Sequence, residues 1–168
     1  ASNSAQNNVA IGYGTLTVIT TGGGNTVVGK SSGAAITTGA NNVAVGASAL
    51  DALTTGQRNV AVGESAMGSA NGAEGRNVAV GFSALATLNS DADNYNTAVG
   101  YNAGTAVTTG ALNTILGANV STNMTTGSSN TLMGYAAGGQ FVEATQNVGI
   151  GYQAMASNGN AADATVTN

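Results

Sequence analysis

Asn42-Val43-Ala44-Val45-Gly46 is written nine times along this chain, with small variations. The asparagines that open the copies are separated by 17, 17, 17, 18, 19, 17, 17 and 17 residues. They are Asn8, Asn25, Asn42, Asn59, Asn77, Asn96, Asn113, Asn130 and Asn147. A fixed period of about 20 residues with one strand-like motif per period is typical of a solenoid, whose coils stack on one another. The sequence therefore predicts a single repeat array over residues 1–168.

The strand of each copy is apolar on both of its sides. Counted from the opening asparagine as position 0, positions 1 and 3 carry Val, Thr, Ile, Leu or Met, and we expect this side to fill the interior of the coil. Position 2 then faces outwards, and its small apolar residues indicate close contact with another chain. The expected interface residues are Ala10, Val27, Ala44, Ala61, Ala79, Ala98, Ile115 and Leu132.

The rest of each copy predicts turns. Position 4 is glycine in all nine copies, which indicates a corner after the strand. The opening asparagine is expected to bond to its counterpart one coil away, in a ladder. The recurring Thr-Thr-Gly, as at Thr37–Gly39, predicts a second short strand and a second corner. The fold class is therefore an all-β parallel β-solenoid of nine coils, which at about 4.8 Å per coil is roughly 43 Å long.

Composition excludes several functions. Charged residues make up 6% of the chain, and it has no His and no Cys, so the commonest general base, metal ligand and thiol nucleophile are missing. We expect no enzyme activity, no cofactor and no metal. The net charge of −4, with three cations, argues against nucleic acid as a partner. No apolar run reaches the roughly 20 residues of a membrane span, so no membrane insertion is expected.

The run at 7–12, Asn-Asn-Val-Ala-Ile-Gly, resembles the head repeats of trimeric autotransporter adhesins. The longer unit at 96–110 is similar to repeats of phage tail fibres. The resemblance implies a parallel β-roll with three chains side by side as a homotrimer, located on an extracellular surface or on a virion. The adhesin repeats are shorter, at about 14 residues. Because the chain begins and ends inside its repeat pattern, we expect it to be part of a longer fibre.

Two regions are candidate contacts with a cell-surface glycan or other receptor. One is the column after the corner glycine, where aromatic rings suit either stacking on sugars or packing along the rod. Its aromatic members are Tyr13, Phe82, Tyr101, Tyr135 and Tyr152. The other is the pair of longer copies, because insertions in solenoids form loops that often bind. There we single out Asp91, Asp93 and Tyr95, as receptor contacts.

The carboxylates of that insertion also have two other interpretations. Asp91, Asp93 and Asn94 offer oxygen ligands to calcium, but the rest of a calcium loop is missing, and a solvated polar turn is favoured. Arg58 and Arg76 are expected to pair with acidic residues of neighbouring coils, namely Glu64 and Glu74.

The favoured function is a structural and adhesive segment of a trimeric fibre, serving as a spacer and as a possible receptor-binding surface. The alternative is an ice-binding solenoid that uses the Thr-Thr-Gly column, although adjacent threonines on a strand point to opposite faces. An acyltransferase of the hexapeptide solenoid type requires a catalytic His and a period divisible by six, and the sequence has neither.

Overall fold

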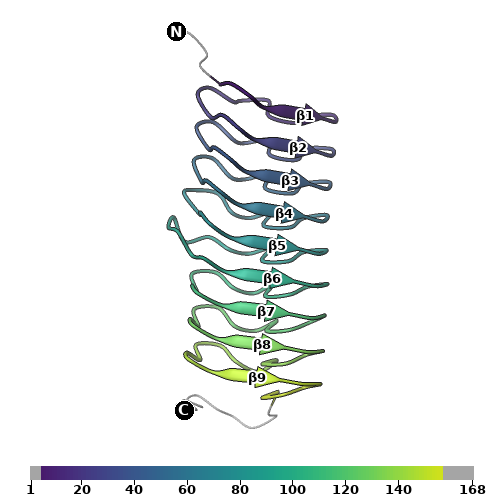
Figure 1. Ribbon diagram of the computed structural model, residues 1–168, viewed down its shortest axis with the longest axis vertical. Coiled ribbons are helices and arrows are strands. Elements are labelled where there is room, and N and C mark those ends of the chain that lie inside the picture. Colours follow the sequence, from purple (N-terminus) through teal and green to yellow (C-terminus); the bar gives the residue numbers. More distant parts are fainter. Residues whose placement is uncertain (1–4, 157–168) are drawn as a thin grey trace.

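The computed structural model describes residues 5–156, and it folds as one rod of stacked coils with a single parallel sheet along its length (Figure 1). Nine three-residue strands follow one another in chain order and make a solenoid of about eight turns, with no helix in this range. They are β1 (Val9–Ile11), β2 (Thr26–Val28), β3 (Val43–Val45), β4 (Val60–Val62), β5 (Val78–Val80), β6 (Thr97–Val99), β7 (Thr114–Leu116), β8 (Thr131–Met133) and β9 (Val148–Ile150). The all-β parallel solenoid predicted from the repeats is confirmed.

The register between strands is constant along the rod. Position 1 of each strand pairs with position 1 of the next, as in Val43 with Val60. The longer copies obey the same rule, because Val60 pairs with Val78, and Val78 with Thr97. Their extra residues are therefore accommodated outside the strands.

A ladder of buried asparagines joins the coils, as predicted. Oδ1 of Asn8 accepts from both the backbone N–H of Asn25, at 2.8 Å, and its side-chain Nδ2, at 3.1 Å. Nδ2 of Asn25 also donates to the carbonyl of Gly39 at 2.9 Å. The same three bonds join Asn25 to Asn42. Both bonds to the preceding Oδ1 recur at the later steps except between Asn77 and Asn96, where the bond from Nδ2 is missing. The asparagines thereby satisfy buried backbone groups of neighbouring coils.

The glycine at position 4 is required at its corner for two reasons. Its φ lies in the left-handed half of the backbone map, as for Gly46 at +137°. A Cβ on Gly46 would also lie 2.5 Å from the carbonyl oxygen of Gly63 in the next coil. The predicted corner is confirmed, and its stacking leaves no room for a side chain.

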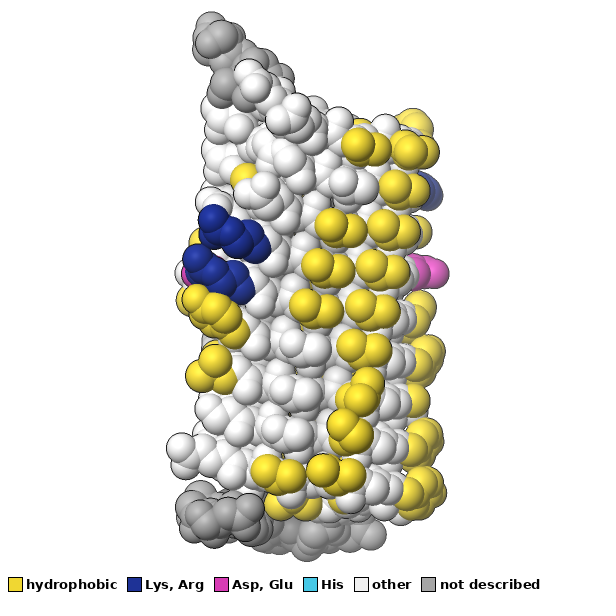
Figure 2. Space-filling model, in the orientation of Figure 1, with side chains coloured by type: hydrophobic (Ala, Val, Ile, Leu, Met, Phe, Trp, Pro, Cys, Tyr) yellow, Lys and Arg dark blue, Asp and Glu magenta, His cyan; other side chains and the backbone are white. Residues whose placement is uncertain are grey.

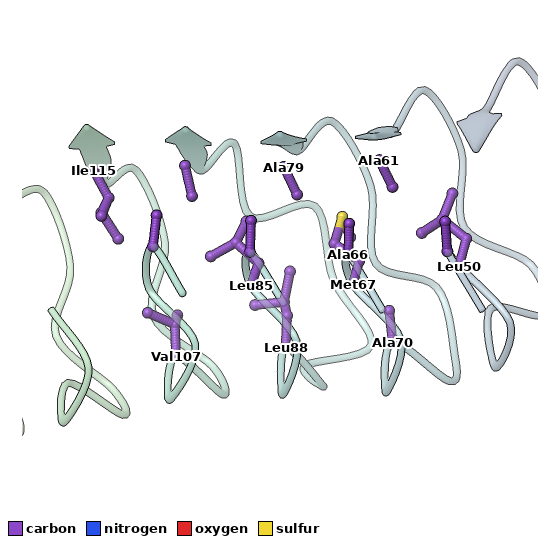
Figure 3. Packing of buried hydrophobic residues seen from close by; sticks show 14 of the residues in the cluster. Leu50, Ala61, Ala66, Met67, Ala70, Ala79, Leu85, Leu88, Val107 and Ile115 are labelled. Carbon is purple, nitrogen blue, oxygen red and sulfur yellow. The ribbon is translucent and has the colours of Figure 1, made fainter. Parts of the chain in front are cut away.

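The predicted orientation of the strands is wrong. Position 2 points into the coil, and the close-up in Figure 3 shows Ala61 and Ala79 directed from their strands towards buried Met67 and Leu85. Seven of the eight residues predicted as a chain interface are 0% exposed in the single chain; they are Val27, Ala44, Ala61, Ala79, Ala98, Ile115 and Leu132. Ala10, in the first coil, is exposed. Positions 1 and 3 face outwards instead.

The small residues at position 2 lie inside because the size of the side chain at position 2 is matched by that at position 8 of the same coil. Where position 2 is alanine, position 8 of the same coil is usually large, as in Ala44 with Leu50. Where position 2 is large, position 8 is small: a Cβ on Gly138 would lie 2.7 Å from Cδ1 of Leu132. The two columns therefore share one narrow interior, in which a large side chain in one column is matched by a small residue in the other.

The second half of each coil consists of turns, and within residues 5–156 the second strand predicted at Thr-Thr-Gly is not formed. Bonds between coils are present there nonetheless. The carbonyl of Thr54 accepts from the backbone N–H of Thr37 at 3.0 Å and from its Oγ1 at 3.1 Å. The prediction failed because the backbone turns too sharply here to be extended, although it still bonds to the next coil.

We expect Asn42→Ala to lower the free energy of unfolding by about 3 kcal/mol, because it leaves the buried Asn59 N–H and the Gly56 carbonyl without partners. Asn71→Ala, at an exposed position, is the matched control, with an expected change within about 0.5 kcal/mol. Denaturant unfolding followed by circular dichroism measures both. Similar losses in the two variants would show that the ladder contributes no special stability.

The residue before each opening asparagine has a left-handed backbone conformation. At position 112 this residue is leucine, whose side chain disfavours that conformation. Leu112 has φ +62° and is 59% exposed. Asparagine tolerates this conformation better than leucine, so Leu112→Asn is expected to raise stability by about 0.5–1 kcal/mol. Leu112→Ala, which keeps the unfavourable conformation, is the control in the same unfolding experiment. The explanation is wrong if the alanine variant gains as much as the asparagine variant.

Candidate functional site

The outward side chains of positions 1 and 3 form one uncharged strip, which we call the strand face. Figure 2 shows hydrophobic side chains in columns along the rod over the strands. Position 3 is apolar in every strand, whereas position 1 is Val in five strands and Thr in the other four. The strand face consists of Val9, Ile11, Thr26, Val28, Val43, Val45, Val60, Val62, Val78, Val80, Thr97, Val99, Thr114, Leu116, Thr131, Met133, Val148 and Ile150.

The predicted aromatic column lies at the corner that follows the strands. Phe82 stacks on Tyr101 with ring centroids 5.3 Å apart, and Tyr135 stacks on Tyr152 at 5.6 Å. Tyr13 is the most exposed of the five and has no stacked ring beside it within residues 5–156. Because the rings pair along the rod, their faces are partly used by each other, and this geometry favours packing over stacking on a sugar.

A pocket of about 420 Å³ lies at the opposite corner, before the strands, where the longer coils insert their extra residues. Basic side chains gather on this side of the molecule, at the left of Figure 2 beside the middle coils. The last residues of four successive coils line this corner pocket; they are Thr38, Thr55, Gln57, Arg58, Ala73, Arg76 and Asp93. The pocket is therefore a product of stacking, because no single coil contains it.

Arg76 is fixed inside the corner pocket by two neighbours from the next coil. Its Nη1 forms an ion pair with Oδ2 of Asp93, and its guanidinium lies over the ring of Tyr95, 5.4 Å from the centroid. The expected pairing of Arg76 with Glu74 is wrong. Arg58 forms no ion pair with any residue in the range 5–156, so its expected pairing with an acidic neighbour is also not found.

Glu74 instead holds the two insertions together. Its carboxylate is fully buried, and Oε2 accepts from the N–H of Gly72 at 3.0 Å. Oε1 accepts from the N–H groups of Ser90 at 2.9 Å and Asp91 at 3.2 Å, in the following coil. Sequence reasoning assigned Glu74 an arginine partner because charge pairing is visible in a sequence, whereas bonding to backbone N–H groups is not. The Glu74 carboxylate therefore fixes the positions of the two inserted loops beside the corner pocket.

The three residues predicted as receptor contacts in the 19-residue copy have different contacts in the structure. Asp93 lines the corner pocket and Tyr95 contacts Arg76, whereas Asp91 bonds to Glu74 through its backbone. Residues 5–156 contain no cluster of three or more acidic, His or Cys residues suited to a metal ion. In the same range no helix is long and apolar enough to cross a membrane.

One carboxyl group elsewhere has a perturbed pKa. Partial burial raises the pKa of Asp51, and hydrogen bonds from its own backbone, from Ser48 and from Ala52 oppose that rise. Asp51 does not line the corner pocket. This group therefore adds nothing to the chemistry of the candidate site.

The Thr-Thr-Gly column is used mainly within the rod. The first threonine of each motif donates its hydroxyl to a carbonyl of the next coil, as Thr20 does to Thr37 at 3.0 Å and Thr108 to Thr125 at 3.1 Å. The second threonine, such as Thr38, is exposed. At most one threonine per motif therefore has a hydroxyl free for solvent, since Thr55 also donates to the carbonyl of Gly72, and the column is interrupted at the longer coils.

Searches of protein-family models, curated proteins and solved structures find no match to this chain. The features that bear on its function are the uncharged strand face, the aromatic column and the corner pocket.

Glu74→Gln is expected to loosen the inserted corner, because an amide offers one acceptor oxygen where the carboxylate offers two. The expected loss is about 1–3 kcal/mol, and the amide protons of Ser90 and Asp91 should exchange faster with solvent. Glu64→Gln, at an exposed position on the other corner, is the control and should leave exchange at Ser90 unchanged. Hydrogen exchange followed by NMR makes the measurement, and unaltered exchange in Glu74→Gln would rule out this role.

Proposed function

We propose that this chain is a structural and adhesive segment of a fibre, in which three copies associate side by side through the strand face. The observation that carries the proposal is that the outer side of the sheet carries no charge, and that its position 3 is apolar in all nine strands while its position 1 is Val or Thr. A sheet that is apolar on both sides is normally covered on both sides. The interior covers one side, and a partner has to cover the other.

The extent of the strand face supports a specific interface. Nine strands about 4.8 Å apart, with two side-chain columns about 7 Å apart, present a strip of roughly 300 Å². This area is comparable to the largest apolar patch of a typical soluble monomer, which measures about 300–600 Å² and is often functional. The aromatic column at Phe82 and Tyr101 adjoins the strip and widens the apolar surface.

A second copy of the same chain is the partner that fits this strip. The coils repeat at a constant register, so the columns of a second rod match those of the first along their whole length. Valine and threonine at position 1 have similar shapes, which keeps the strip even where the residue type changes. The resemblance to trimeric adhesin heads sets the expected number of copies at three and supports an adhesive role at an extracellular surface or on a virion.

The purified chain is expected to sediment as three copies of the 16.1 kDa protein. Val45→Lys combined with Leu116→Lys places two charges on the strand face, and should yield folded monomers because a buried unpaired charge is costly. Analytical ultracentrifugation gives the mass, and circular dichroism reports folding.

The matched control is Ser69→Lys with Gln140→Lys, which adds the same charges at exposed positions of the turns. It should remain trimeric. A wild-type chain that stays monomeric at high concentration contradicts the proposal, and so does a trimer that the strand-face lysines leave intact.

A further inference from the structure

The corner pocket concentrates positive charge in a chain that has very little of it. Two of the three cations of the protein, Arg58 and Arg76, line it, although the net charge of the chain is −4. Asp93, the one acidic lining residue, neutralises Arg76, and the buried Glu74 carboxylate is bonded to backbone N–H groups. The unpaired positive charge of the pocket is therefore that of Arg58, which suits an anionic group.

The two arginines are not equivalent. The guanidinium of Arg76 is already held by Asp93 and by the ring of Tyr95. Arg58, on the adjacent coil, has no ion pair within the part of the chain that the structure describes and is exposed. An arginine guanidinium binds a carboxylate through two parallel hydrogen bonds. Arg58 therefore has its full set of donors available to a ligand, while Arg76, neutralised by Asp93, forms a fixed wall beside it.

The other walls are neutral and offer hydrogen bonds. Within residues 5–156, the side chains of Thr38 and Gln57 have no hydrogen-bond partner that the structure shows. Thr55 donates its hydroxyl proton to the carbonyl of Gly72 at 3.2 Å, which leaves its oxygen free to accept. Ala73 adds a small apolar patch. Hydroxyl and amide groups beside an apolar patch match the hydroxyls and C–H faces of a sugar ring.

The side of the pocket formed by the insertions is held in place by contacts within the protein. Glu74 ties the two insertions together through three backbone N–H groups, and Gly75 forms a bridge to Asp93 between the coils. A volume of about 420 Å³ lies within the range of about 300–1,000 Å³ that is typical of small-ligand sites. Preorganised walls reduce the cost of ordering on binding.

We propose that the corner pocket binds a carboxylate-bearing sugar unit, such as a uronic acid or a sialic acid at the end of a glycan. Arg58 binds the carboxylate, the ion-paired Arg76 forms the wall beside it, and Thr55 and Gln57 bind ring hydroxyls. This inference rests on the adhesive part of the proposed function, for which it names the class of receptor. The aromatic corner takes no part in it.

The test is titration of the whole chain with methyl β-D-glucuronide, followed by ligand-observed NMR and calorimetry. Methyl β-D-glucoside, which has a hydroxymethyl group in place of the carboxylate, should bind at least tenfold more weakly. A methyl sialoside distinguishes the second type of acidic sugar. Arg58→Gln should weaken glucuronide binding at least tenfold, and Lys30→Gln, which removes a cation at the other corner, should not.

Several outcomes overturn the proposal. The proposal is wrong if the glucoside binds as well as the glucuronide, if the Arg58→Gln variant binds glucuronide normally, or if neither acidic sugar binds. It is also wrong if sodium sulfate binds as tightly as the sugars, because the pocket would then be a simple anion site. Sedimentation of the same samples separates this inference from the fibre proposal. If the chain is a monomer that binds glucuronide through Arg58, the pocket proposal stands and the trimer proposal is wrong. If the chain is a trimer that does not bind glucuronide, the trimer proposal stands and the pocket proposal is wrong.

Discussion

Hydrogen bonding between successive asparagines is the constraint on which the rest of the rod depends. Each amide completes the bonding of backbone groups that its own coil cannot satisfy, and it does so at one fixed point per repeat. This point sets the register, and the register places every other residue of the coil above its counterpart. The even columns of the strand face and the four coils that line the corner pocket both follow from that alignment.

Much of the fold could be predicted from the sequence because its signals are local and repeated. The strand at Val43–Val45, the corner at Gly46 and the ladder at Asn42 each need one residue type at one position, and nine copies remove the ambiguity. The facing of the strand could not be predicted from one position alone, because both of its sides are apolar. The informative signal was a pair of positions: Ala44 with Leu50 against Leu132 with Gly138. Such compensation identifies residues that share an interior.

The candidate site was predicted in part for a related reason. The insertion that carries Asp93 and Tyr95 is visible as an irregular spacing, and the structure brings both residues to Arg76. Arg58 lies on a different coil, and its place in the corner pocket follows only from stacking. The role of Glu74 was missed because its partners are backbone N–H groups of two loops, which have no signature in side-chain chemistry.

Lengthening a coil costs little stability, and the structural change is confined to the corner that holds the inserted residues. Between Asn77 and Asn96, across the 19-residue copy, the backbone N–H still donates to the preceding Oδ1 at 2.9 Å, whereas the Nδ2 of Asn96 donates only to Gly110. One amide bond is lost, and the strands on either side stay paired. Longer loops add only about 0.6 kcal/mol for each doubling of their length. The corner thus accepts grafted peptides without disturbing the scaffold, so that engineered coils would display epitopes at intervals set by the rise of the sheet.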